Sequence, residues 1–232
     1  VYRVDLRLRP FGESGPVAVS FDAMEEYLQQ HGRDWERYAY VKARPVYGAE
    51  PGFDDLYRDA LRPFVYRRYL DFSVFESLRA MKELIAREVE RRELQQNVKL
   101  GPGGIREIEF IVQAFQLLRG GSTQRLQTRS LLEALPQLAG QKLLPADTVT
   151  ELLAAYRFLR RVENRLQMEA ERQVHHVPRA PQALARLARA MGFTSPDASE
   201  RFQTCLQEKR TIVLGPFATE IAAGGRERIL EL

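Results

Sequence analysis

The feature that most constrains the fold is a change in hydrophobic periodicity at Ser20. Before it, residues 1–9 alternate strictly between apolar and polar side chains, which is the pattern of a half-buried β-strand. Residues 16–20 form a second short run, and glycines at 12 and 15 indicate a turn between the two. After Ser20, whose hydroxyl suits a helix N-cap, apolar residues recur at helical spacing. The sequence therefore predicts a β-hairpin over residues 1–20 followed by a mainly α-helical body.

The helical patterns and the residues that bound them define a series of predicted helices. Pro63 is expected to kink or divide the third of them. The tail after Arg210 contains Gly215-Pro216 and Gly224-Gly225 and gives only a weak signal. The predicted helices cover residues 21–30, 35–44, 54–68, 72–96, 105–119, 128–135, 146–172, 181–191 and 198–210. A boundary near Gly120 would divide residues 1–120, which handle a nucleotide, from a helical bundle at 121–232.

Composition excludes several classes of protein. No run of about 18 apolar residues exists, so the sequence predicts no contact with a membrane interior. The single cysteine, Cys205, cannot form an internal disulfide and fits a reducing cytoplasm. The net charge of +4 is small and the basic residues are mixed with glutamates, so no nucleic-acid groove is expected. A nucleotide or an acidic partner remains compatible with this charge.

The polar face of the first predicted strand is the first candidate site. It carries one carboxylate, Asp5, among three guanidiniums, those of Arg3, Arg7 and Arg9. A carboxylate suits a divalent metal, and arginines suit phosphate oxygens. The structural alternative is a surface strand whose Asp5 is simply paired with an arginine.

A glycine pair before the helix at 105–119 is the second candidate site. Gly103 and Gly104 allow close approach of a ligand, and the free amides at a helix start attract anions. Lys99 lies just upstream and could reach the same anion, while Glu107 could face a cleft and Glu109 falls on the apolar stripe of the helix. The alternative is a glycine-rich turn followed by an ordinary helix with one buried salt bridge.

Two further groups of charged residues are interpreted as structural. In the helix at 146–172, Glu163 interrupts an apolar stripe and arginines surround it, which predicts a buried Glu–Arg pair. In the helix at 35–44, Glu36 is expected to pair with Tyr40 or Arg44, and Trp35 and Tyr38 are expected to pack in the core. The His175-His176 pair follows the long helix and is expected to be structural.

Several long motifs together resemble the bifunctional glutamine synthetase adenylyltransferase/adenylyl-removing enzyme. They are Arg3-Val-Asp-Leu-Arg-Leu-Arg-Pro-Phe-Gly-Glu-Ser-Gly-Pro16, Gly32-Arg-Asp-Trp-Glu-Arg-Tyr38 with Lys42-Ala-Arg44, Asn97-Val-Lys-Leu-Gly-Pro-Gly-Gly-Ile-Arg-Glu-Ile-Glu-Phe110, Phe158-Leu-Arg-Arg-Val-Glu-Asn-Arg-Leu-Gln167 and Gln173-Val-His-His-Val-Pro178. The resemblance runs from Val1 to about Pro178 and is expected to extend to Arg210. Arg9-Pro-Phe-Gly12 and Trp35-Glu-Arg37 resemble the amino-terminal, adenylyl-removing half rather than the adenylylating half.

The resemblance implies a fold, a reaction and partners. The fold would be the remnant of a DNA polymerase β-like nucleotidyltransferase sheet followed by a helical bundle. The reaction would be phosphorolysis of adenylyl-tyrosine on glutamine synthetase, with Mg²⁺ as cofactor and with ATP or ADP and phosphate as nucleotide and phosphate substrates. The PII signal protein would be a second partner. Asp5 matches the third carboxylate of the family's metal triad and would be both catalytic residue and metal ligand. Arg3, Arg7, Lys99, Gly103, Gly104 and Glu107 would bind nucleotide or phosphate.

The same resemblance implies that a Gly-Ser motif and an Asp-x-Asp pair precede Arg3. We therefore expect the 232 residues alone to bind metal poorly and to be inactive. The runner-up function is a non-catalytic helical module that docks on glutamine synthetase or the PII protein, and the third is the adenylylating half. An Asp-x-Asp pair upstream of Arg3 would favour the enzyme over the docking module.

Overall fold

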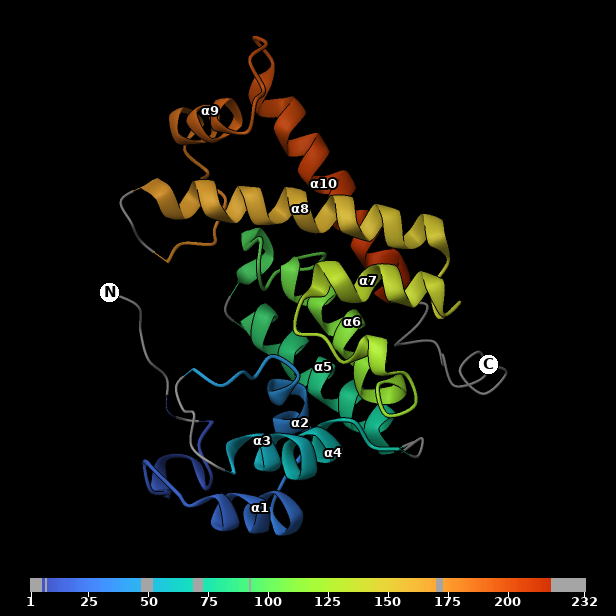
Figure 1. Ribbon diagram of the computed structural model, residues 1–232. Helices are drawn as coiled ribbons and strands as arrows, with labels where there is room; N and C mark the ends of the chain where they lie inside the picture. The colour runs from blue at the N-terminus through green and yellow to red at the C-terminus, as the bar shows by residue number, and fades with distance from the viewer. Residues whose placement is uncertain are drawn as a thin grey trace. The chain divides into compact units, whose positions relative to one another are not determined.

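The structure is a computed structural model that describes residues 6, 8–46, 52–68, 73–91, 93–169 and 173–217, and it is mainly helical (Figure 1). The described elements are the α-helices α1 (Phe21–Gln30), α2 (Asp34–Tyr40), α3 (Phe53–Asp55), α4 (Arg62–Val65), α5 (Ser73–Arg91), α6 (Ile105–Arg119), α7 (Leu131–Gly140), α8 (Ala146–Met168), α9 (Pro181–Ala190) and α10 (Ala198–Phe217), the π-helical η2 (Leu56–Leu61), and the 3₁₀ turns η1 (Gly12–Ser14), η3 (Leu94–Gln96) and η4 (Gln124–Leu126). Within these ranges the one β-type contact is an antiparallel bridge between Asn97 and His176.

The chain forms two compact units that interleave along the sequence. One contains residues 1–77 and 113–130, and the other contains residues 78–112 and 131–232. The helices α5 and α6 each contribute to both units, so the structural division is not a single cut. The boundary near Gly120 that the sequence predicts concerns function, and it stays a prediction.

Helices with clear capping signals begin where the sequence predicts. The Ser20 side chain accepts a hydrogen bond from the amide of Ala23, so α1 spans the predicted 21–30. The glycine pair before Ile105 sets the start of α6, which also ends at the predicted Arg119. These two predictions are confirmed because a local side chain or a glycine fixes each boundary.

The predicted hairpin is not seen where the structure describes it. Residues 1–5 and 7 of the first strand lie outside the described residues, and Pro16 to Ser20 is irregular rather than a strand. Local turns form here instead, because the backbone amides of Arg9 and Gly12 donate to carbonyls three residues earlier, those of Leu6 and Arg9. The Arg9 guanidinium adds bonds to the carbonyls of Leu6, Glu13 and Gly15 at 3.0–3.1 Å, and the turn closes as η1.

Other helix boundaries differ from the predicted ones. The helix predicted over 72–96 ends at Arg91 and a separate turn, η3, follows it. The segment predicted as helix over 54–68 changes from α to π and back to α between Phe53 and Val65, with Pro63 near the start of α4. At the other end of the chain, α10 continues past Arg210 to Phe217.

The first unit is held by a polar cluster at α2. The Tyr27 hydroxyl donates to Glu36 at 2.6 Å, and the backbone amide of Arg33 donates to the same carboxylate at 2.9 Å. Arg37, only 1% exposed, donates to the carbonyls of Phe64 and Val65. Glu36 is therefore satisfied by Tyr27 and Arg33 rather than by the predicted partners.

The aromatic core predicted for this helix is partly wrong. Trp35 is 42% exposed, because the buried face of α2 is occupied instead by the two charged residues Glu36 and Arg37 and their internal partners.

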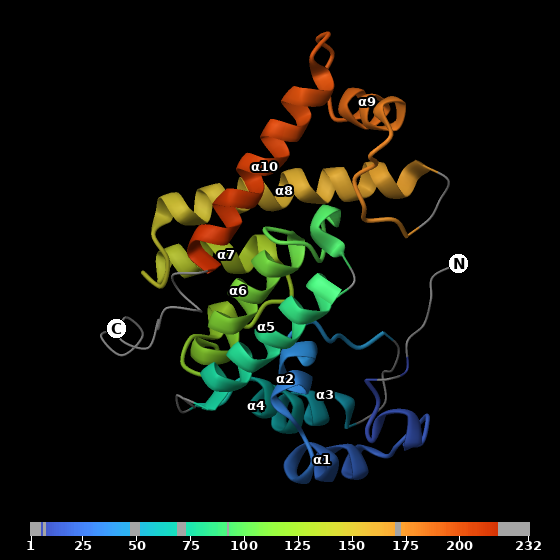
Figure 2. The same ribbon diagram turned by 180° about the vertical axis from the view of Figure 1, so that it is seen from behind.

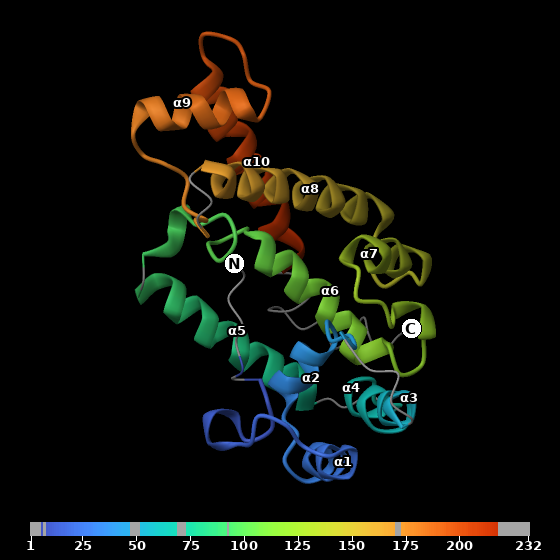
Figure 3. The same cartoon turned by 60° about the vertical axis from the view of Figure 1, so that its left-hand side comes forward.

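The second unit is built around α8. Figures 1 and 2, seen from opposite sides, show α10 crossing α8, and Figure 3 shows α7 and α9 near its two ends. One face of α8 is apolar and supplies the centre of this core, with Leu152, Ala155, Leu159 and Val162 fully buried. From α10, Phe202 packs near Phe158 of α8, with ring centroids 6.3 Å apart. This core supports the loop at 97–104, where the sequence-predicted residues of the second candidate site lie.

Candidate functional site

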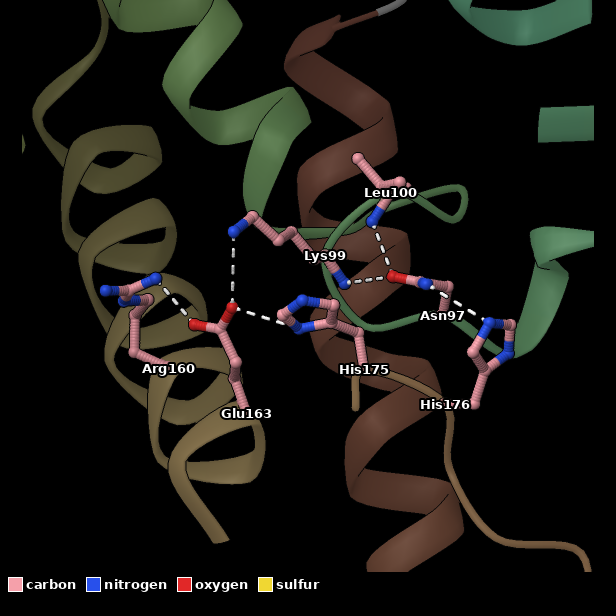
Figure 4. Close-up of polar contacts among 7 residues, drawn as sticks. All are labelled: Asn97, Lys99, Leu100, Arg160, Glu163, His175 and His176. Carbon is pink, nitrogen blue, oxygen red and sulfur yellow. Dashed lines mark hydrogen bonds and ion pairs between the residues drawn. The ribbon is translucent and has the colours of Figure 1, made fainter. Parts of the chain in front are cut away.

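The loop before α6 is folded around the side chain of Asn97. Its Oδ1 accepts from the backbone amides of Lys99 at 3.0 Å and Leu100 at 2.9 Å (Figure 4). Asn97 is buried, so these bonds are shielded from water. The result is a compact turn that delivers Gly103 and Gly104 to the start of α6.

Gly103 is required by both conformation and space. Its φ is +67°, and a Cβ at this position would lie 2.5–2.6 Å from the backbone of Arg210 on α10. Gly104 is also enclosed, since a Cβ there would lie 2.7 Å from the carbonyl oxygen of Gly101. The glycine pair therefore allows the loop to approach α10 and to close on itself.

The amides at the start of α6 are already bonded within the chain. The amide of Gly103 donates to the Glu107 carboxylate at 2.7 Å, and the amide of Gly104 donates to the carbonyl of Gly101. The amides of Ile105 and Arg106 donate to the carbonyls of Val98 and Lys99 at 3.0 Å each. The helix start does receive an anion, but that anion is the chain's own Glu107. These contacts favour the structural alternative that the sequence left open.

Lys99 points toward a buried carboxylate on α8. Glu163, whose side chain is 3% exposed, contacts Arg160 at 2.5 Å, His175 at 3.2 Å and Lys99 at 3.7 Å (Figure 4). The Glu–Arg pair predicted for this helix is thereby confirmed, but only its glutamate is buried, since Arg160 is 43% exposed. We call Glu163 and its three basic neighbours the Glu163 cluster; it joins the loop, α8 and the segment after α8.

Burial dominates the electrostatics of His175. Desolvation is the main cause that lowers the pKa of His175 below its usual value, and the charge of Lys99 acts in the same direction. Glu163 opposes this shift, while His176 and Arg160 add to it. The Nδ1 atom lies 3.2 Å from Glu163 but outside hydrogen-bond geometry, so the contact is electrostatic and strengthens on protonation.

Two further contacts fix the loop from the opposite side. The Asn97 side-chain amide lies 3.3 Å from Nε2 of His176. Arg210 of α10, which is 6% exposed, donates to the carbonyls of Gln95 and Asn97 at 2.9 and 3.3 Å. Burial lowers the pKa of Arg210, and no acidic partner within ion-pair distance is present in the described part of the chain.

A cleft of about 270 Å³ opens beside the same loop. Its walls are mainly apolar and come from α5, the loop and α6, and the buried ring of Phe110 forms one of them. Charged side chains stand among the lining residues, which are Ile85, Ala86, Val89, Glu90, Gln95, Leu100, Pro102, Arg106, Glu107 and Phe110. A cleft of this kind holds a small, largely apolar group and orients it through a few charges.

The sequence-predicted site residues divide into two sets. Lys99, Gly103, Gly104 and Glu107 are brought together in one loop and helix start, although their contacts are with the chain itself. Arg3, Asp5 and Arg7 lie outside the described residues. Among the residues that the structure describes, no group of three His, Cys, Asp or Glu side chains could hold a metal ion. A magnesium site at Asp5 therefore stays a prediction.

The sequence predicts that Glu107 could face a cleft, and Glu107 does line the one described above. It assigns no role to Asn97 or Arg210. Asn97 belongs to the glycine-loop motif, and asparagine is common in turns. The sequence does not show, however, that its side chain would accept hydrogen bonds from the amides of Lys99 and Leu100. Arg210 is separated from the loop it holds by more than a hundred residues, so only the fold brings them together.

Among the described helices, none is long and apolar enough to cross a bilayer.

Two protein families match consecutive parts of the chain. Residues 1–55 match the model of the GlnE family, glutamate-ammonia ligase adenylyltransferase, and residues 79–219 match that of the GlnD PII-uridylyltransferase family. The sequence predicts that the resemblance to the adenylyltransferase reaches Pro178 and extends to Arg210, whereas that family's model matches residues 1–55. Because the second match covers more than half of the 232 residues, the chain belongs to the GlnD PII-uridylyltransferase family and, with the GlnE match ahead of it, is a nucleotidyltransferase of the GlnE/GlnD type.

Proposed function

We propose that this chain is part of the enzyme that removes AMP from adenylyl-tyrosine of glutamine synthetase, the full protein also adenylylating it, in nitrogen regulation. The observation that carries the proposal is the GlnE match over residues 1–55, which contain the Arg3-Val-Asp-Leu-Arg7 motif. The motif variants at Arg9 to Gly12 and Trp35 to Arg37 support the adenylyl-removing half. The expected partners are glutamine synthetase and the PII protein, in the cytoplasm.

In this reaction an oxygen of inorganic phosphate attacks the phosphorus of the adenylyl group. The bond from that phosphorus to the tyrosine oxygen breaks, ADP is released, and the phenol recovers its proton. Mg²⁺, when bound, would neutralise charge on the phosphoryl oxygens during transfer. Asp5 would hold the metal, and Arg3 and Arg7 would orient phosphate through their planar guanidiniums. The Glu163 cluster would keep the loop before α6 in place while the substrates bind.

The test measures ADP release by the enzyme that carries this chain. Adenylylated glutamine synthetase, phosphate, Mg²⁺ and the uridylylated PII protein are supplied together, and Asp5→Asn is compared with Asp22→Asn, a control on the exposed start of α1. We expect Asp5→Asn to abolish release with an unchanged circular dichroism spectrum, and Asp22→Asn to behave as wild type. Wild-type rates in Asp5→Asn would refute the role of Asp5.

The second candidate is a helical module that docks on glutamine synthetase or the PII protein without catalysing. It is favoured by the GlnD match over residues 79–219, most of which belongs to the second, helical unit. An enzyme that binds either partner but releases neither ADP from adenylylated glutamine synthetase nor UMP from uridylylated PII protein would support this candidate. Release of UMP alone would place the chain's activity on PII instead.

A further inference from the structure

One face of α8 carries three arginines spaced four residues apart. Arg157, Arg161 and Arg165 are all exposed, and we call them the arginine ridge. Residues four apart are neighbours on a helix surface, so the three guanidiniums form a continuous row. Nowhere in the described ranges does an acidic side chain lie within ion-pair distance of any of them. The nearby carboxylate of Glu163 is buried and already bound to Arg160.

The arginine ridge does not stabilise the isolated helix. Like charges at this spacing cost about 0.2–0.5 kcal/mol per pair. The helix dipole favours cations only in the last turn, which in α8 includes Arg165 but not Arg157 or Arg161. Two of the three arginines therefore have no stabilising partner within the described fold, and a ligand outside the chain would supply one.

The neighbours of the arginine ridge have the composition of a protein interface. A shallow depression beside it is lined by Leu132, Tyr156 and Asn164 as well as by Arg157 and Arg161. Leu132 is 44% exposed, although it is apolar. Tyrosine and arginine are enriched in protein–protein interfaces. A nucleic-acid surface would instead need a wider basic stripe than three arginines in a chain of net charge +4.

At the carboxyl end of the same helix Met168 is 67% exposed. Methionine is also enriched in protein interfaces, because its unbranched side chain adapts to different partners. Met168 also contacts the arginine ridge directly, because its Sδ accepts a hydrogen bond from Arg165 at 3.3 Å. An exposed apolar side chain thus lies at the end of the ridge, as Leu132 lies beside it.

We propose that the arginine ridge of α8 binds an acidic segment of a partner protein, with carboxylates about one helical turn apart matching the guanidiniums. The inference goes beyond the proposed function, since it assigns a docking surface and holds whichever nucleotidyl group is transferred. Arg157 and Arg161 would provide the charged contacts, and Leu132 and Met168 would bury apolar groups next to them.

The test uses a fluorescein-labelled helical peptide with glutamate at every fourth position and measures its binding to the 232-residue chain by fluorescence anisotropy. The double variant R157E/R161E is compared with R179E/R189E, which changes the net charge equally at two other exposed arginines without ion pairs among the described residues. We expect R157E/R161E to weaken binding about tenfold at low salt and the control to stay within about twofold. Circular dichroism confirms that both variants are folded, and R157Q/R161Q provides a milder replacement.

Three results would overturn the proposal. Equal losses in the two double variants would show that only net charge matters. Peptide affinity that does not fall with added salt would exclude pairing with exposed guanidiniums. A single-stranded RNA or an anionic lipid vesicle that binds more tightly than the peptide, and loses this binding in R157E/R161E, would assign the surface to another class of ligand. None of these readouts involves turnover, so they are distinct from failure of the proposed function.

Discussion

Replacement of Glu163 by glutamine is the most direct test of how the loop before α6 is held. The side chain is 3% exposed and meets Arg160 at 2.5 Å, His175 at 3.2 Å and Lys99 at 3.7 Å. Glutamine preserves the volume but removes the negative charge, leaving three basic side chains around a neutral amide. The change therefore isolates the charge from the packing of α8.

The expected loss can be worked out from these contacts. A hydrogen bond to a charged group contributes about 1 kcal/mol more than a neutral one, and Glu163 accepts one such bond, from Arg160. Its contacts with His175 and Lys99 are electrostatic only, and glutamine weakens these as well. Lys99 is more distant, and both Lys99 and Arg160 are more than a third exposed, so water screens part of their charge. We expect Glu163→Gln to lower the free energy of unfolding by about 2 kcal/mol. For a chain of this length that corresponds to a Tm lower by about 4–8 °C.

Urea unfolding followed by circular dichroism measures this loss. The matched control is Glu169→Gln, which removes the same charge from an ion pair with Arg186 whose two side chains are 60% and 59% exposed. Exposed pairs contribute little, so the control should change the free energy of unfolding by less than about 0.5 kcal/mol. Equal effects of the two variants would refute the reasoning, because the buried cluster would then contribute no more than a solvated pair.

Three further predictions concern the same loop. Gly103→Ala should destabilise the chain by about 2 kcal/mol or more in the same unfolding assay, because the position has φ +67° and no space for a Cβ. The control Gly140→Ala adds a Cβ that meets nothing within 4 Å, so it should be neutral or stabilising. A larger loss of stability in Gly140→Ala than in Gly103→Ala would contradict this reasoning. Because burial lowers the pKa of His175, the unfolded chain binds this proton at a higher pH than the folded chain does. The free energy of unfolding should therefore fall as the pH drops below the usual histidine value of about 6.5, and it should fall less in His175→Gln over the same range. Lys99→Ala and Lys142→Ala should bind phosphate equally in calorimetry, because Lys99 is engaged with a carboxylate; weaker binding in Lys99→Ala alone would restore the anion site.

Local signals explain which parts of the fold follow from the sequence. The N-cap at Ser20 and the glycine pair before Ile105 set the starts of α1 and α6 because each acts on its own backbone. The hairpin prediction failed in its described part because local backbone turns form there, and the Arg9 side chain adds bonds to the carbonyls of Leu6, Glu13 and Gly15. Alternation of side chains carries no information about such turns.

The candidate site shows the same limit. The pairing of Glu163 with Arg160 was predictable, since both lie on one helix three residues apart. Its contacts with Lys99 and His175 depend on how the loop before α6 and the segment after α8 pack against α8. The periodicity of the sequence does not specify that packing.

The role of the glycine pair before α6 depends on which side chains lie around it. Free amides at a helix start attract an anion, and the sequence predicts a phosphate or nucleotide there. In the folded chain the amide of Gly103 donates instead to the carboxylate of Glu107, four residues further along. Glu107 also lines the cleft beside the loop, so the same side chain closes the glycine turn and faces that cleft. A ligand that reached the Gly103 amide would have to displace this carboxylate, whereas a ligand in the cleft would contact Glu107 without breaking the turn.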